Sequence, residues 1–271
     1  MMFVCVTMWG GVCELKWQTM SDDKLVSSSK IRHILEDSEG YIWYATEGNG
    51  ICRDNGHDLL VFRSDAQNPD LLGSNNVNCL VEIPGRNGRF GQMLIGTYHG
   101  AYILDKNDYG IKRIQEVDDK RIDDICLTSE GHYWITANKK LYEFSPAGSL
   151  LGCYPSLWKG KSCYVSDIAE DSQGRIWVSQ WDGGLLVRER GNARFVEAEW
   201  PLDVAPTALV EDTLNGCFWI GCIDNGVVSY RFPSQGGKAI VEYQHKAFGP
   251  EMPISSRVCI SLQMDVSGDC L

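Results

Sequence analysis

The feature that most constrains the fold is a tight Asp-x-x-Gly turn followed by a strand that carries a tryptophan. Its clearest copy contains Asp37, Gly40 and Trp43. An aspartate can hydrogen-bond the backbone two residues further on, and glycine adopts a positive φ without strain. The residues after the turn are aromatic and β-branched, as a half-buried strand prefers. Each copy therefore predicts two antiparallel strands joined by a tight turn.

This unit recurs along the chain. In one copy Thr128 replaces the aspartate, and a divergent copy has Leu94 in place of the tryptophan and an enlarged turn, residues 84–91. A last copy begins at Leu262 and reaches Leu271 before its tryptophan. The other matching positions are Gly131 and Trp134, then Asp171, Gly174 and Trp177, and finally Asp212, Gly216 and Trp219.

The spacing of these copies indicates the architecture. Positions 43, 94, 134, 177 and 219 are separated by 51, 40, 43 and 42 residues. A period of roughly 40–50 residues with several short strands is typical of a propeller blade, whereas helical repeats need an apolar period of 3.6 residues. No long window shows that helical period. We therefore predict an all-β fold, a β-propeller of four-stranded antiparallel blades that begin near residues 31, 77, 122, 165, 207 and 258, the sixth being truncated.

The pattern resembles the two-component regulator propeller repeat, I-x-E-D-x-x-G-x-I-W-x-x-T-x-x-G-L. Two further segments, residues 23–29 and 70–76, resemble the family's D-G-L-S-S-N-S segment, which leads into the inner strand of a blade. The resemblance implies the periplasmic sensor of a hybrid two-component system, which is a homodimer that senses an oligosaccharide. It also implies a ring of seven blades, so we expect this chain to be a fragment completed by further blades or by a second propeller. The family's histidine kinase is absent from these residues.

Composition excludes some classes of function. The formal charge of −11 argues against a nucleic-acid partner, whose phosphates are bound by Lys and Arg. No apolar run approaches the roughly 18 residues of a membrane span. The first 16 residues are apolar and uncharged up to Cys13. We interpret residues 1–16 as a degraded signal peptide, with a stray strand of another blade as the alternative, and residues 17–271 as the partial propeller.

The eleven cysteines do not show the spacing of a zinc site. Several of them fall in or beside predicted strands, namely Cys79, Cys126, Cys217, Cys222 and Cys259, and we expect these to be small buried hydrophobic residues. Cys153 and Cys163 flank one loop, and a bridge between them is an alternative in an oxidising compartment. No metal ligand set and no cofactor is predicted.

Strand order places the turns between second and third strands on one face, together with the links between blades. Aromatic rings that stack on a sugar and side chains that bond its hydroxyls are what carbohydrate recognition requires. Asn, Asp and Gly are also ordinary turn residues, which is the alternative interpretation. The candidate ligand-binding residues on this face are Asn49, Tyr98, His99, Trp181, Asp182, Asp224 and Asn225.

The sequence shows no catalytic motif. Asp22–Asp23, Asp118–Asp119 and Asp123–Asp124 are adjacent acids, but sequence neighbours on a strand point to opposite faces, so we interpret them as solvated turns or strand ends. His33 is predicted to be a core histidine. We predict a non-enzymatic sensor. A propeller lyase with its site on the rim, hinted at only by Tyr98 and His99, is one alternative, and a non-functional remnant is another.

Overall fold

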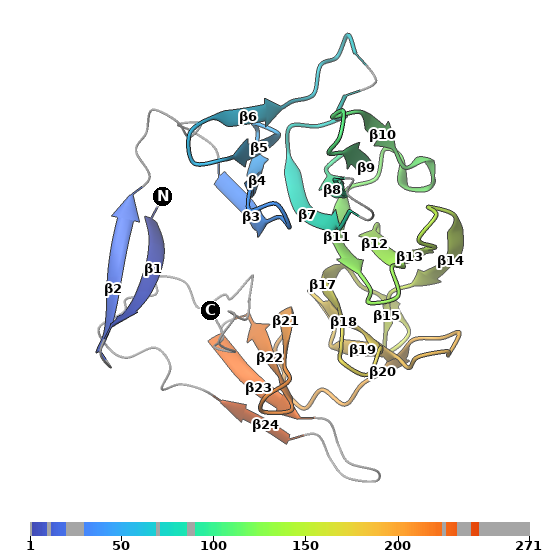
Figure 1. Ribbon diagram of the computed structural model, residues 1–271. Helices are drawn as coiled ribbons and strands as arrows, with labels where there is room; N and C mark the ends of the chain where they lie inside the picture. Colours follow the sequence, from blue (N-terminus) through green and yellow to red (C-terminus); the bar gives the residue numbers. More distant parts are fainter. Residues whose placement is uncertain are drawn as a thin grey trace.

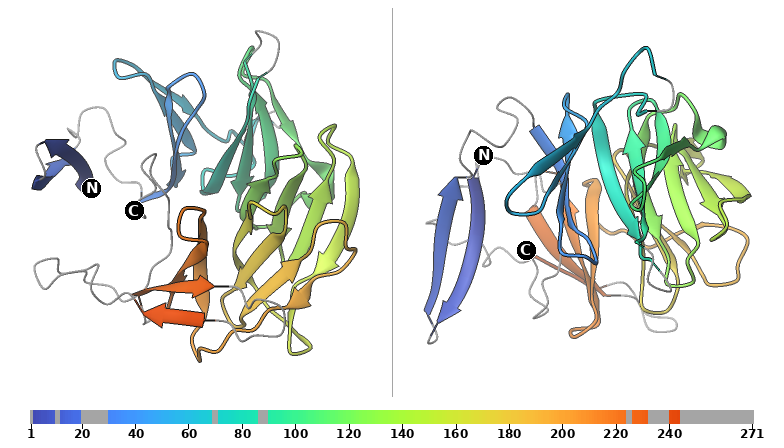
Figure 2. Two further views of the ribbon diagram at one scale, coloured as in Figure 1. Left: turned by 60° about the horizontal axis from the view of Figure 1, so that its bottom comes forward. Right: turned by 45° about the horizontal axis from the view of Figure 1, so that its top comes forward.

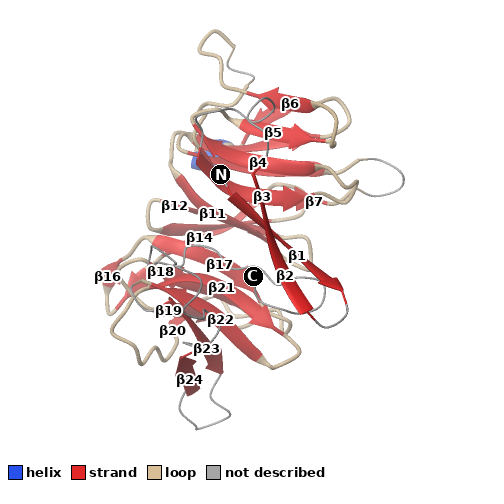
Figure 3. Cartoon of the chain, turned by 90° about the vertical axis from the view of Figure 1, so that its left-hand side faces the viewer, coloured by secondary structure: helices blue, strands red, loops and turns tan. Residues whose placement is uncertain are grey.

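The computed structural model describes residues 2–9, 12–19, 30–68, 71–85, 90–223, 226–231 and 240–243. These residues form five antiparallel four-stranded sheets that follow one another around a common centre (Figure 1), so the predicted all-β propeller is confirmed. The sixth blade predicted near residue 258 lies outside the described residues. Within the described ranges, helix is limited to one turn of 3-10 helix, η1 (Gln115–Val117), and Figure 3 shows mainly strands.

Each blade has its first strand nearest the centre and its fourth at the perimeter (Figure 1). Blade one contains β3 (Lys30–Glu36), β4 (Ile42–Glu47), β5 (Ile51–Asp54) and β6 (Leu59–Phe62). Blade two contains β7 (Val77–Ile83), β8 (Gln92–Thr97), β9 (Gly100–Asp105) and β10 (Ile111–Arg113). Blade three contains β11 (Ile122–Leu127), β12 (Tyr133–Ala137), β13 (Lys140–Phe144) and β14 (Leu150–Pro155).

Blade four contains β17 (Val165–Glu170), β18 (Ile176–Gln180), β19 (Leu185–Arg188) and β20 (Val196–Glu197). Blade five contains β21 (Pro206–Asp212), β22 (Cys217–Cys222), β23 (Gly226–Arg231) and β24 (Ile240–Tyr243). A small hairpin, β15 (Leu157–Trp158) and β16 (Lys161–Ser162), lies in the link between blades three and four. Figure 2 follows the blades from blue blade one to orange blade five.

The N-terminal residues form a separate two-stranded hairpin of β1 (Met2–Trp9) and β2 (Val12–Thr19). It stands apart from the five blades in Figure 1. The boundary expected at residue 16 falls inside β2.

The Asp-x-x-Gly turn forms as predicted. Its aspartate also accepts a hydrogen bond from the tryptophan of the same blade, which the sequence does not predict. In blade one, Asp37 Oδ1 accepts the backbone N–H groups of Glu39 and Tyr41, and Gly40 has φ 84°. The other carboxylate oxygen accepts the indole N–H of Trp43 at 2.7 Å. The same indole bond recurs from Trp177 to Asp171 at 2.9 Å and from Trp219 to Asp212 at 3.1 Å. The aspartate therefore fixes both the turn and the tryptophan of its blade.

The tryptophans build the core between blades. Trp43 packs with Leu80, Met93 and Tyr102 of blade two, and Trp177 lies 5.3 Å from the ring of Phe218 in blade five. Leu94 fills the equivalent position of blade two and is fully buried. Burying rings of this size supplies much of the stabilisation of such an interface.

A second contact joins neighbouring blades and is here called the Ser–Glu latch. Ser38, which follows the turn aspartate, donates its N–H and its hydroxyl to Glu82 of the next inner strand, at 2.8 and 2.7 Å. Ser172 makes both bonds to Glu211 at 2.7 Å. Ser129 makes the same pair of bonds to Glu170, at 2.6 and 3.3 Å. The latch therefore holds blade one to two, three to four, and four to five.

The cysteines of the inner and second strands and His33 are expected in the core. Cys79, Cys126, Cys217 and Cys222 are buried, as expected, and Cys259 lies outside the described residues. Cys153 and Cys163 are both free. His33 accepts the N–H of Leu80 at 2.9 Å, and burial lowers its pKa, which confirms a satisfied core histidine.

Candidate ligand-binding rim

One face of the propeller, here called the rim, carries the turns between second and third strands and the links between blades. This follows from the strand order, in which antiparallel strands alternate in direction from the centre outwards. The Asp-x-x-Gly turns lie on the opposite face. The rim therefore includes turns 47–50, 98–99, 138–139 and 181–184 and links 63–68 with 71–76, 114–121, 156–164 and 198–205. Asp224 and Asn225 lie outside the described residues.

Candidate residues of blades one and two make contacts within their own neighbourhood. The Asn49 side-chain oxygen accepts a hydrogen bond from Arg63 at 3.1 Å. Arg121 lies 4.6 Å from the centre of the Tyr98 ring. His99 Nδ1 lies 3.2 Å from the Asp119 carboxylate, and both side chains are exposed. Each of these three candidates thus has a partner in its own turn or in the adjoining link.

Trp181 and Asp182 of blade four lie beside a second aromatic residue, Tyr164. The backbone N–H of Trp181 donates to the carbonyl oxygen of Tyr164 at 3.0 Å. The Asp182 carboxylate accepts the backbone N–H of Tyr164 at 3.3 Å. The side chains of Trp181 and Tyr164 are 41% and 50% exposed. Two exposed rings are therefore displayed on adjoining rim segments.

A pocket of about 270 Å³ opens on the rim where the turn of blade four meets the links on either side of that blade. Asp182 is the one sequence-predicted candidate that lines it, and Trp181 is next to it in the chain. The lining residues are Trp158, Lys159, Asp182, Gly183, Trp200, Leu202, Asp203, Val204 and Ala205.

Local contacts hold the two pocket tryptophans in place. The Trp200 indole donates to the carbonyl oxygen of Val204 at 2.8 Å, which closes the link over residues 200–204. The Trp158 ring lies against Gly184, where a Cβ would be 2.4 Å from its Cη2 atom. Because only glycine leaves that space, the turn of blade four admits the indole. The walls of the pocket are thus set by backbone geometry.

The chemistry of this pocket suits a polyhydroxylated ligand. Two half-buried indoles stand near two exposed carboxylates, Asp182 and Asp203, with the ammonium group of Lys159 at the margin. Aromatic surface plus a few placed polar groups is the usual composition of a small-molecule site. A larger hollow of about 410 Å³ at the perimeter, lined by Tyr154, Leu186 and Phe195 among others, is mainly apolar. It lacks the paired carboxylates of the rim pocket.

Sequence reasoning missed Trp158, Trp200, Lys159 and Asp203. The available signal was the position of the two tryptophans, which fall outside the repeated tryptophan column and inside the links between blades. Both rings also pack against core clusters, Trp158 against the one that contains Trp134 and Trp200 against the one that contains Trp177. They line the pocket, whereas the tryptophans of the repeated column do not.

The interpretation of Asp123 and Asp124 as solvated residues is wrong. Both lie in the inner strand β11, next to a β-bulge, and the Asp123 side chain is only 14% exposed. Burial raises the pKa of Asp123 to about 6, against the opposing effect of Arg121. Burial and the neighbouring Asp167 raise the pKa of Asp124, whose Oδ2 accepts the N–H of Ile168 at 3.2 Å. Pattern alone cannot reveal this burial, because it comes from the neighbouring blade.

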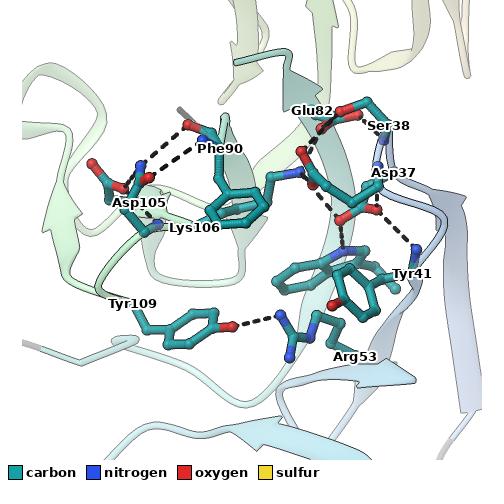
Figure 4. Close-up of polar contacts among 12 residues, drawn as sticks. Asp37, Ser38, Tyr41, Arg53, Glu82, Phe90, Asp105, Lys106 and Tyr109 are labelled. Carbon is teal, nitrogen blue, oxygen red and sulfur yellow. Dashed lines mark hydrogen bonds and ion pairs between the residues drawn. The ribbon is translucent and has the colours of Figure 1, made fainter. Parts of the chain in front are cut away.

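An acidic cluster on the opposite face is occupied by a lysine (Figure 4). Oxygen atoms of Asp37, Glu39 and Glu82 lie within 4.8 Å of one another. Figure 4 shows Lys106 pointing toward Asp37 and Glu82. Lys106 Nζ lies 3.2 Å from Asp37 and 2.5 Å from Glu82, and it also contacts Glu39. Lys106 is 5% exposed, so the ammonium group neutralises part of the cluster and joins blade two to blade one.

The fold defines the chain as a β-propeller, and a pocket opens on its rim. The family model of the two-component regulator propeller matches residues 25–48 and 159–182, which confirms the resemblance found in the sequence. Comparison with curated proteins finds no match. Among the described residues, no helix has the length and apolar character needed to cross a membrane.

Solved structures share the fold. The extracellular domain of the one-component system BT4673 from B. thetaiotaomicron has a TM-score of 0.68 and 21% identity, covering 92% of this chain and 31% of that one. For the extracellular domain of the hybrid two-component system BT3049 from the same organism, the values are 0.69, 16%, 96% and 34%. Virginiamycin B lyase from Staphylococcus aureus gives 0.65, 14%, 86% and 74%. The chain thus spans about a third of the length of the two extracellular sensor domains.

Proposed function

We propose that this chain is part of the sensor region of a hybrid two-component system, located in the periplasm, and that its rim pocket binds an oligosaccharide. The observation that carries the proposal is the pairing of Trp158 and Trp200 with Asp182 and Asp203 around one pocket. The match to the regulator propeller and the similarity to two sensor domains support the signalling role. Binding is then passed on through the rest of a longer, homodimeric protein.

The proposal includes no catalytic activity for this chain. The lyase alternative requires a histidine with a tyrosine, or a metal-binding cluster, that converge at the mouth of the central tunnel. His99 lies instead against Asp119, and neither Tyr98 nor His99 lines the rim pocket. The likeness to virginiamycin B lyase is one of fold at 14% identity.

Calorimetric titration with a panel of oligosaccharides tests the proposal. For any sugar that binds, replacing Trp158 or Asp203 with alanine should weaken the affinity at least tenfold, because stacking and hydroxyl contacts are lost. Leu214→Ala is the matched control, since Leu214 is 75% exposed on the opposite face. Equal affinity in the wild type and in both rim variants would exclude this pocket. Lack of binding across the panel would exclude the function.

A further inference from the structure

Four lysines gather around one part of the rim, although the chain carries a formal charge of −11. Lys139 lies in the turn between β12 and β13, Lys140 is the first residue of β13, and Lys159 and Lys161 lie in the hairpin of β15 and β16. The two segments are joined by hydrogen bonds. The Ser156 N–H donates to the Lys139 carbonyl at 2.9 Å, and Lys139 Nζ donates to the Ser162 carbonyl at 3.1 Å. The four residues, here called the lysine cluster, therefore share one surface.

Among the described residues, the side chains of the cluster lysines have no carboxylate partner, unlike several other basic residues of the chain. Lys106, Arg113 and Arg188 each form an ion pair with a carboxylate. None of the four cluster lysines forms an ion pair within the described part of the chain. Lys140, Lys159 and Lys161 are also exposed. Their charge is therefore available to a ligand.

Aromatic rings lie directly beneath this charge. Lys139 Nζ is 4.3 Å from the centre of the exposed Tyr164 ring, and Lys159 Nζ is 5.5 Å from that of Trp158, which lines the rim pocket. Asp182 and Asp203 on the same pocket can accept sugar hydroxyls. A cation that lies over an aromatic ring beside the pocket is well placed to meet an acidic substituent of a sugar bound there.

We propose that the rim binds an acidic oligosaccharide, whose carboxylate or sulfate groups are recognised by the lysine cluster while the sugar rings stack on Trp158. This inference rests on the proposed function and narrows its ligand class. A neutral sugar of the same length would leave the cluster without a partner. Because the lysines are at the surface, their contribution should fall as salt screens the charges.

The test compares a galacturonate tetrasaccharide with its fully methyl-esterified form, which has the same backbone and no charge. We expect the acidic sugar to bind at least tenfold more tightly in 50 mM NaCl, and the difference to shrink in 500 mM NaCl. A set of sulfated tetrasaccharides and their desulfated forms then distinguishes sulfate from carboxylate recognition. The combined variant Lys140→Gln, Lys159→Gln and Lys161→Gln should abolish the preference. The combined arginine variant should keep it.

Lys112→Gln, an exposed change on the outer strand of blade two, is the control and should leave both affinities unchanged. Circular dichroism of the glutamine variant shows whether it is folded. Equal binding of charged and uncharged forms, or binding of neutral sugars alone, would overturn the acidic ligand and leave the proposed function standing. Failure of every sugar to bind would remove both.

Discussion

At the scale of single residues, the turn aspartate is the position on which each regular blade depends. Asp171 accepts the N–H groups of Gln173 and Arg175 at 2.9 Å each and the Trp177 indole at 2.9 Å. One carboxylate thus satisfies a turn and a buried ring at once. Blade three shows what remains without it, because Thr128 donates its hydroxyl to the His132 carbonyl at 3.0 Å and contributes no oxygen to its tryptophan.

Replacing Asp171 with alanine should destabilise the fold by about 2–4 kcal/mol, since buried donors lose their acceptor. Asp171→Asn should cost less, because its amide oxygen still serves the turn. Urea unfolding of both variants measures the difference. Equal loss of stability in the alanine and asparagine variants would show that the hydrogen bonds to the turn contribute little.

Asp123, unlike Asp171, destabilises the fold when it is charged. One of its oxygens is buried without a hydrogen-bond partner, and its pKa is raised from 3.8 to about 6. The folded state therefore binds a proton more tightly than the unfolded state, so stability from this group is complete below pH 4 and is lost as the pH rises through 6. Asp123→Asn should raise stability at pH 7.5 by up to about 3 kcal/mol and leave it nearly unchanged at pH 4.

Thermal melts of wild type and Asp123→Asn across pH 4–8 check this. Curves that stay parallel over the whole range would show that Asp123 does not titrate in the folded protein.

At the scale of elements, the side-chain contacts between neighbouring blades contribute to the stability of the propeller. The Ser–Glu latch between blades four and five should show a coupling of about 1 kcal/mol in a double-mutant cycle of Ser172→Ala and Glu211→Gln. The same serine change combined with Glu82→Gln, which belongs to a different latch, should be additive. Chemical denaturation measures the free energy of unfolding of every variant. Coupling in both cycles would show that the coupling is not specific to the serine and glutamate of one latch.

Lys106 is a second joint, because it meets three carboxylates from blades one and two. Lys106→Met should destabilise the fold by roughly 3–5 kcal/mol, since buried acids lose their counter-charge. Calcium should partly restore the melting temperature of this variant, because hard cations prefer carboxylate oxygens and the three acids lie within 4.8 Å of one another. Lys112→Met is the exposed control, and restoration of both variants by calcium would argue against the cluster.

The sequence predicts the elements well and the joints poorly. The blades expected to begin near residues 31 and 77 begin with β3 (Lys30–Glu36) and β7 (Val77–Ile83). These succeed because period-2 pattern and turn chemistry are local. The latch, the burial of Asp123 and the rim pocket around Trp158 and Trp200 arise between blades, so no single repeat contains them.

At the scale of the whole molecule, the inner strands differ in how many neighbouring inner strands of the described residues pack against them. β11 packs between β7 and β17, whereas β3 and β21 belong to the first and last of the five blades (Figure 1). Amide hydrogen exchange should therefore be slowest in β11 and faster in β3, because local opening costs less where fewer contacts are broken. Mass spectrometry of peptides from the three strands measures this. Uniform protection would mean that the five blades open as one cooperative unit.

The latch has a consequence for how such a protein can grow or shrink. Because Ser129 and Ser172 occupy the same place in successive repeats, a gene rejoined from the codon of Thr128 to that of Ser172 loses one whole repeat and still presents a serine to Glu211. Recombination between repeats can thus change the number of blades without inventing a new interface. Because the same interface recurs between blades, the number of blades depends on how many repeats the gene encodes.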